Sequence, residues 1–217
     1  MIIYNPHNEN ITKERIEEAQ KILVSIPTKY CFISGSFLFK KDYKDIDVFV
    51  ISRTKKQIKP IDKKINIIMI DFNDLHSLFY HSVSKSCIAK NILPKKPLKV
   101  TITDYWNVVN EAIPTIMNEK DKYHKNIRFL ILYTEYFKNN RILDTYELTR
   151  EIEKFKNFKE ILEYVKREIP IVINKSIKKS YIKKYFYTQA GYYKNSLEYE
   201  SQRYLYELSH SIAKGAA

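Results

Sequence analysis

Glycine and cysteine are scarce in this chain. Only 3 of its 217 residues are glycine and only 2 are cysteine, Cys31 and Cys87. So few glycines exclude a fold that depends on many left-handed turns. Two cysteines that lie far apart in the sequence exclude a disulfide-rich secreted scaffold and a structural zinc site. A hydrophobic core must therefore stabilise the chain, and Cys31 is interpreted as part of that core.

Long apolar segments are missing as well. No stretch approaches the roughly 18 consecutive apolar residues that a membrane-spanning helix requires. The first residues, Met-Ile-Ile-Tyr-Asn-Pro, do not show the charged region and long apolar stretch of a secretory signal. We therefore expect no membrane association, a cytoplasmic location and reduced thiols.

The abundant residue types predict a folded, basic protein. Hydrophobic residues make up 44% of the chain and charged residues 29%, which is ordinary for a globular fold and unlike a disordered one. The net charge of +13 favours an anionic partner, and RNA is the partner we expect. The alternative is that the excess of lysine, together with isoleucine, tyrosine and asparagine, reflects an AT-rich genome.

The first hundred residues carry both strand and helix patterns. Short apolar runs that are rich in β-branched and aromatic residues predict strands at 29–34, 45–52 and 64–72. An apolar repeat at helical spacing predicts helices at 12–26, capped by Thr12, and at 74–83, capped by Asn73. The proline-marked stretch 93–98 is typical of a boundary. We therefore expect an α/β (α+β) domain at residues 1–98.

The remaining residues have helical periodicity almost throughout, which predicts an all-α helical bundle domain at 99–217. The expected helices are 104–117, 123–137, 145–155, 158–167 and a long segment from 171 onwards.

The long last segment has two faces of different character. At helical spacing, Ile177, Tyr181 and Tyr185 share one face, which we expect to pack in the core. A nearly opposite face carries three lysines. With nearby tyrosines, these lysines form a candidate RNA-binding surface, whose residues are Lys175, Lys179, Lys183, Tyr187, Tyr192 and Tyr193.

The strongest functional pattern lies between residues 30 and 52. A predicted strand runs into Gly35-Ser36, where backbone N–H groups and a hydroxyl can hold phosphate oxygens. After eight intervening residues, Asp45 and Asp47 are separated by one residue in a predicted strand, so both carboxylates project from the same face. Such a pair is typical of a site for hard divalent ions. We expect Asp45 and Asp47 to bind Mg²⁺ or Mn²⁺ next to a nucleoside triphosphate.

These residues resemble the nucleotidyltransferase superfamily associated with DNA polymerase β, whose pattern is a strand, Gly-Ser, a short spacing and Asp-x-Asp in the next strand. The size and the appended helices are similar to minimal nucleotidyltransferases and AbiEii-type toxins. The resemblance implies a nucleotidyltransferase domain with a mixed sheet, which moves a nucleoside monophosphate from an NTP to RNA, such as tRNA, or to a protein. It also implies a role in a toxin–antitoxin or phage-defence system, with a cognate antitoxin as a possible partner.

The resemblance implies a third carboxylate on the next strand, and three residues compete for that position. Asn66 stands where the family pattern has an aspartate, Asp71 is the nearest carboxylate of the strand, and Asp62 precedes the strand. We take Asp71, with Asp45 and Asp47, as the candidate catalytic set. If Asn66 holds the position, the neutral amide binds metal more weakly and cannot act as a base. Two alternatives follow: a degenerate transferase fold that binds nucleic acid or protein, and a helical interaction protein whose Asp pair is incidental.

Overall fold

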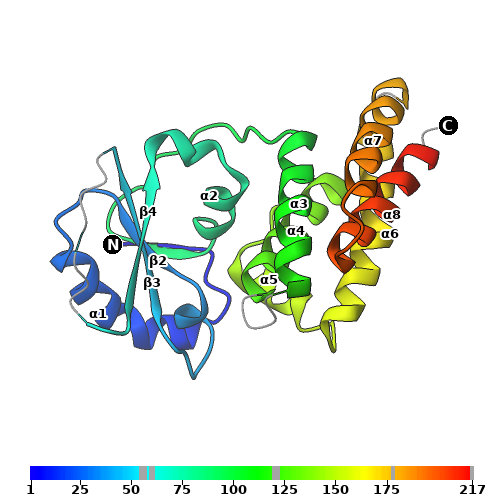
Figure 1. Ribbon diagram of the computed structural model, residues 1–217. Coiled ribbons are helices and arrows are strands. Elements are labelled where there is room, and N and C mark those ends of the chain that lie inside the picture. The colour runs from blue at the N-terminus through cyan, green and yellow to red at the C-terminus, as the bar shows by residue number, and fades with distance from the viewer. Residues whose placement is uncertain (54–57, 59–61, 119–122, 177–178, 216–217) are drawn as a thin grey trace. The chain divides into compact units, whose positions relative to one another are not determined.

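The structure is a computed structural model that describes residues 1–53, 58, 62–118, 123–176 and 179–215 (Figure 1). The chain forms two units. The first consists of Met1–Lys99 and Ile142–Thr149, and the second of Val100–Arg141 and Arg150–Ala217. Residues 142–149, expected in the helical domain, therefore belong with the first unit, because their polar groups hydrogen-bond to it.

The first unit is built on a mixed five-stranded sheet, so the expected α+β class holds at this level. The strands are β1 (Ile2–Tyr4), β2 (Cys31–Ser34), β3 (Ile46–Ser52), β4 (Ile65–Asp71) and β5 (Cys87–Ala89). Their order is β1-β5-β2-β3-β4, with β3 and β4 parallel and every other pair antiparallel. The pattern-based strands correspond to β2, β3 and β4. The strands β1 and β5 are only three residues long, so neither shows an alternation of apolar and polar residues from which it could be predicted.

Helices cover both faces of this sheet (Figure 1). The helix α1 (Glu9–Ser25) lies on one face, and α2 (Leu78–Val83), preceded by the 3₁₀ turn η2 (Phe72–His76), lies on the other. Alternate strand residues point to alternate faces, so each strand contributes to two cores. The α1-side core contains Ala19, Leu23, Ile33, Val48 and Val50. The α2-side core contains Phe32, Phe49, Ile70, Leu75 and Tyr80.

Two of the expected helix caps are wrong. Asn8 caps α1 by accepting a hydrogen bond from the N–H of Ile11, whereas Thr12 is buried inside the helix. Ser77 caps α2, and Asn73 lies within η2 instead. Both errors have the same cause: several polar residues near each start can accept the same bond, and local sequence does not decide among them.

The second unit is helical. The helix α5 spans both units, because its residues up to Thr149 belong to the first unit and those from Arg150 belong to the second. The helices are α3 (Ile102–Asn118), α4 (Tyr123–Asn139), α5 (Thr145–Ile152), α6 (Phe158–Ser176), α7 (Lys179–Lys194) and α8 (Glu200–Gly215). The break expected between 167 and 171 is wrong, because α6 continues through Pro170. Buried residues on both sides of the proline, Ile169 and Val172, hold this helix in place and offset the proline's cost. No helix of the described part of the chain is both long and apolar enough to cross a membrane.

The expected packing of α7 is also wrong. Its buried face consists of Ile182, Phe186, Ala190 and Tyr193, whereas Tyr181 is 71% exposed and Tyr185 44%. Tyrosine carries both a ring and a hydroxyl, so its place in a helical repeat does not decide whether it is buried. The side chains of Ile177 and Lys179 lie outside the described residues, and those of Lys175 and Lys183 are exposed.

Candidate functional site

The sheet brings the Gly35 turn and Asp47 together. Strands β2 and β3 pair so that Ser34 lies opposite Asp47, and Gly35 follows directly at the end of β2. Gly35 has φ 96°, a conformation that only glycine adopts without strain. A Cβ built on Gly35 would come within 3.3 Å of Asp47 Oδ2. The carboxylate of Asp47 therefore lies directly beside Gly35, whose missing side chain leaves space for it.

Asn66 is the neighbour of Asp47 on the next strand. The parallel register of β3 and β4 pairs these two residues, and Asn66 Nδ2 donates a hydrogen bond of 2.9 Å to Asp47 Oδ1. Ser34, Asp47 and Asn66 thus form one row across β2, β3 and β4. Asp45 immediately precedes β3 and is exposed. Three of the expected site residues, Gly35, Asp45 and Asp47, therefore meet at one end of the paired strands.

The structure does not bring Asp71 to this row. Asp71 ends β4 and pairs with Ser52, five residues beyond Asn66, which is roughly 16 Å along an extended strand. Its carboxylate caps η2 by accepting a 2.7 Å hydrogen bond from the N–H of Asn73. Asp62 lies in the turn before β4, where its Oδ1 accepts from the N–H of Lys64. The choice of Asp71 as the third carboxylate is therefore corrected: the residue beside Asp47 is Asn66.

The donor set of this row suits a magnesium ion. It offers the carboxylate of Asp47 and the amide oxygen of Asn66, and Asp45 lies two residues before Asp47; all three are hard oxygen ligands, beside a turn that can hold phosphate. Mg²⁺ commonly uses one or two carboxylates and completes its shell with water and phosphate oxygens. Within the described residues, no group of three or more His, Cys, Asp and Glu side chains could hold a metal.

Ser36 opens the short 3₁₀ turn η1 (Ser36–Leu38), whose side chains anchor it in the core. Phe37 is 1% exposed and packs edge-on against Tyr43. Arg15, which the sequence patterns did not single out, lies over both rings, and its Nη2 donates to the carbonyl oxygens of Lys40 and Lys41. Arg15 therefore positions the loop that connects the Gly35 turn to Asp45.

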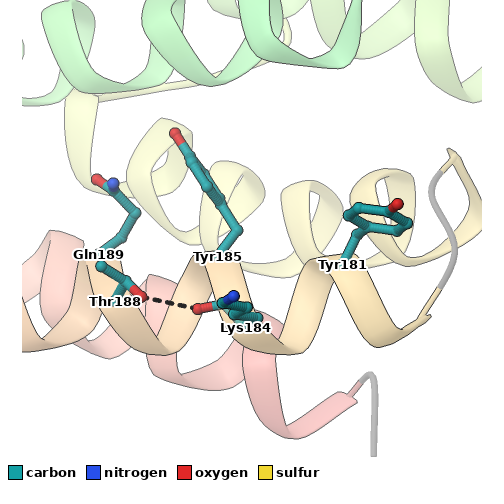
Figure 2. A pocket seen from close by; sticks show the side chains of 5 residues that line it. All are labelled: Tyr181, Lys184, Tyr185, Thr188 and Gln189. Atoms are coloured by element: carbon teal, nitrogen blue, oxygen red, sulfur yellow. Dashed lines mark hydrogen bonds between the residues drawn. The ribbon is translucent and has the colours of Figure 1, made fainter.

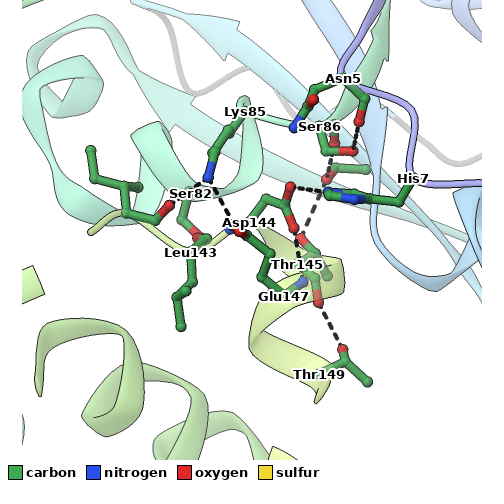
Figure 3. A network of polar contacts seen from close by, with 12 residues as sticks. Asn5, His7, Ser82, Lys85, Ser86, Leu143, Asp144, Thr145, Glu147 and Thr149 are labelled. Carbon is green, nitrogen blue, oxygen red and sulfur yellow. Dashed lines mark hydrogen bonds and ion pairs between the residues drawn. The ribbon is translucent and has the colours of Figure 1, made fainter. Parts of the chain in front are cut away.

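A polar network that includes His7, Ser86, Asp144, Thr145 and Glu147 (Figure 3) adjoins the row, because Ser34 hydrogen-bonds to it. The hydroxyl of Ser34 donates to the carbonyl oxygen of Ser86 at 2.9 Å and lies 3.4 Å from the hydroxyl of Thr145, the first residue of α5. The buried carboxylate of Asp144 forms an ion pair with His7 and accepts from the N–H of Glu147 at 2.9 Å. The start of α5 is therefore attached to the strand that carries Gly35.

The sequence did contain one signal for this network. Asp144 and Glu147 form a reciprocal capping box, because Glu147 Oε2 also accepts from the N–H of Asp144 at 3.0 Å. That pattern predicts a helix start at residue 145. It does not predict that Asp144 is fully buried or that its partner is His7, which lies far away in the sequence.

Neither cysteine is suited to nucleophilic chemistry. Cys31 and Cys87 are both buried, which confirms the interpretation of Cys31 as a core residue. Burial raises the pKa of both thiols, because the thiolate would lose its hydration. Both therefore stay protonated at neutral pH.

The two glycines Gly35 and Gly191 offer a matched test of the turn. Gly35→Ala is expected to lower the free energy of unfolding by about 1–3 kcal/mol, because alanine is strained at positive φ and its Cβ presses on Asp47. Gly191→Ala is the control, because it lies inside α7 with nothing within 4 Å of an added Cβ. The Gly191→Ala substitution should raise the free energy of unfolding by about 0.5–1 kcal/mol. Urea unfolding measures both, and equal effects would contradict the described turn.

Comparison with protein-family models, with curated proteins and with solved structures gives no match for this chain.

Proposed function

We propose that the chain is a magnesium-dependent nucleotidyltransferase that moves a nucleoside monophosphate from an NTP to an acceptor hydroxyl. The observation that carries this proposal is the position of the Asp47 carboxylate beside the positive-φ turn at Gly35, two residues after Asp45. A turn that can hold phosphate and carboxylates that can hold its metal thus occupy one place, which neither feature alone would indicate.

Each residue of the proposed site has a separate role. Backbone N–H groups of the turn and the hydroxyl of Ser36 hold phosphate oxygens. Asp45 and Asp47 would hold Mg²⁺, which would neutralise the charge that develops on the phosphates. Asn66 orients Asp47 through its hydrogen bond. In the transfer, the acceptor oxygen bonds to the α-phosphorus, the bond from that phosphorus to the bridging oxygen breaks, pyrophosphate leaves with the electron pair, and the acceptor proton passes to solvent.

The acceptor in this proposal is RNA, for which tRNA is one candidate, and a protein is the alternative. The support for RNA is the net charge of +13, because cationic surfaces raise the local concentration of polyanions. The resemblance to minimal nucleotidyltransferases and AbiEii-type toxins adds the proposal of a role in a toxin–antitoxin or phage-defence system. A cognate antitoxin would then be a further partner.

A second candidate function follows from Asn66. A neutral amide lies where a third carboxylate would strengthen the metal site, and it already donates to Asp47. A site weakened in this way could bind nucleotide or nucleic acid without transfer. The first candidate requires activity in the natural chain, whereas the second requires none.

The test is a transfer assay with each of the four α-³²P-labelled NTPs and either total RNA or total protein as acceptor, run with Mg²⁺ and with EDTA. The proposal predicts label in RNA that depends on Mg²⁺. Asn66→Asp is assayed alongside. Transfer by this variant alone would establish the degenerate site, and absence of transfer by both chains, to RNA and to protein, would overturn the proposal of an enzyme.

A further inference from the structure

The helix α7 has an unusual composition for a surface helix. Within Lys179–Lys194 the sequence contains four lysines and five tyrosines and no aspartate or glutamate. Tyr181 is 71% exposed and Tyr185 44%, and the neighbouring Lys184 is exposed as well. Tyr181 and Tyr185 are one helical turn apart, so their exposed rings form a contiguous aromatic patch, and such a patch marks an interaction site more often than a single exposed side chain does.

The exposed tyrosines of α7 border two hollows. An open groove of about 520 Å³ is lined by Tyr181, Lys184, Tyr185, Thr188 and Gln189 (Figure 2). A pocket of about 300 Å³, on the side of α3, shares both tyrosines and adds Ile102, Thr103, Trp106, Ile182 and Phe186. Tyr181 and Tyr185 therefore stand between the two hollows, and each ring has space beside it for a flat group.

We propose that this surface of α7, defined by Tyr181, Lys184 and Tyr185, binds single-stranded RNA. The tyrosine rings stack on unpaired bases, and Lys184 contacts a phosphate between them. Tyr181 and Tyr185 are one turn apart, about 6 Å along the helix axis, so each can take a separate base. Paired bases are covered by their neighbours in a duplex, which makes double-stranded RNA a poorer ligand.

The charge of α7 favours RNA over a protein as the partner of this surface. A protein partner of mixed charge would gain little from a helix that carries only positive side chains, whereas RNA carries a negative charge on every nucleotide. This inference deepens the proposed function by placing the RNA acceptor. The role of the bound RNA as the acceptor rests on the proposed function. The binding itself does not, because it requires neither NTP nor Mg²⁺.

Fluorescence anisotropy with a labelled 12-nucleotide RNA of mixed, non-pairing sequence, without NTP or Mg²⁺, tests the proposal. Tyr181→Ala with Tyr185→Ala should weaken binding at least about ten-fold, because two bases lose their stacking surface. Tyr181→Phe with Tyr185→Phe is the matched control, which keeps the rings and should bind as the parent does. Circular dichroism checks that both variants are folded, which is expected because the two side chains are exposed.

Lys184 is tested by the salt dependence of the same binding. Lys184→Gln should make the log–log slope shallower by about 0.7, because each phosphate that a lysine neutralises on a single strand accounts for about 0.7 of the slope. The control Lys13→Gln removes the same charge from an exposed position of α1 and should leave the slope unchanged.

Several results would overturn the proposal. They are equal binding by the parent and the Tyr→Ala variant, equal binding of a duplex of the same length, an equal change of slope in Lys184→Gln and Lys13→Gln, or no RNA binding at low salt. The last result would favour a protein partner for this surface. Asp47→Asn should bind RNA as the parent does, so a failure of transfer is distinguished from a failure of binding.

Discussion

Replacing Asp47 by asparagine is expected to reduce Mg²⁺-dependent transfer at least about 10³-fold, equivalent to about 4 kcal/mol of transition-state stabilisation. The substitution keeps the size of the side chain and an oxygen that can accept from Asn66 Nδ2, so the local fold should survive. It removes the negative charge that would hold the metal of the proposed site beside the Gly35 turn. The measurement is the initial rate of NMP transfer at saturating Mg²⁺.

Asp71→Asn is the matched control for that experiment. It is the same substitution in the same unit, but Asp71 caps η2 and pairs with Ser52, away from Asn66. We expect its transfer rate to stay within about two-fold of the parent and its free energy of unfolding to change by less than about 0.5 kcal/mol, because asparagine keeps an oxygen that can accept from the N–H of Asn73. A large loss of activity in Asp71→Asn, or full activity in Asp47→Asn, would contradict the assignment of the site.

Asp144→Ala is expected to lower the free energy of unfolding by about 2–4 kcal/mol. Its carboxylate is fully buried, forms the ion pair with His7 and accepts from the N–H of Glu147. Breaking a buried ion pair costs about 3–5 kcal/mol, and losing a helix cap about 1 kcal/mol. His7 moderates the total, because its ring is 22% exposed and can reach water once it loses its partner.

Asp104→Ala provides the comparison for Asp144. Asp104 accepts from the N–H and the hydroxyl of Thr101 at the start of α3, and it is partly exposed. Its replacement should cost only about 1 kcal/mol. Urea unfolding measures both variants, and hydrogen exchange of peptides from β2 and α5 locates the effect. Equal costs for the two variants would mean that the buried pair with His7 does not stabilise the attachment of α5.

The part of the site that could be predicted from the sequence consists of residues that lie close together in the chain. Gly35, Asp45 and Asp47 fall within thirteen residues, and the alternation of a strand places both aspartates on one face before any tertiary contact is known. The strand β3 was predictable for the same reason, because its apolar run is continuous and bounded by polar residues. Arg15 was not predictable, because an arginine inside a helix carries no sign that it will reach a loop.

The third position of the site shows where sequence reasoning stops. Asn66 and Asp71 belong to the same strand, and alternation says only that they face opposite sides. Which of them neighbours Asp47 depends on the register between β3 and β4, and a register is set by core packing across strands. The shift of a few residues along β4 changes a candidate carboxylate into an amide, and with it the expected strength of the metal site.

The sequence by itself determined the elements whose information is local: the strands around the Gly35 turn, the Asp45 and Asp47 pair, and the helical nature of the second half. Only the tertiary structure decided which distant residues meet. It placed Asn66 beside Asp47, attached Ile142–Thr149 to the first unit through His7, and turned Tyr181 and Tyr185 to the surface of α7. The physical reason is that periodicity reports the repeat of one element, whereas register, burial of a polar group and rotation of a helix depend on the energy of packing against other elements.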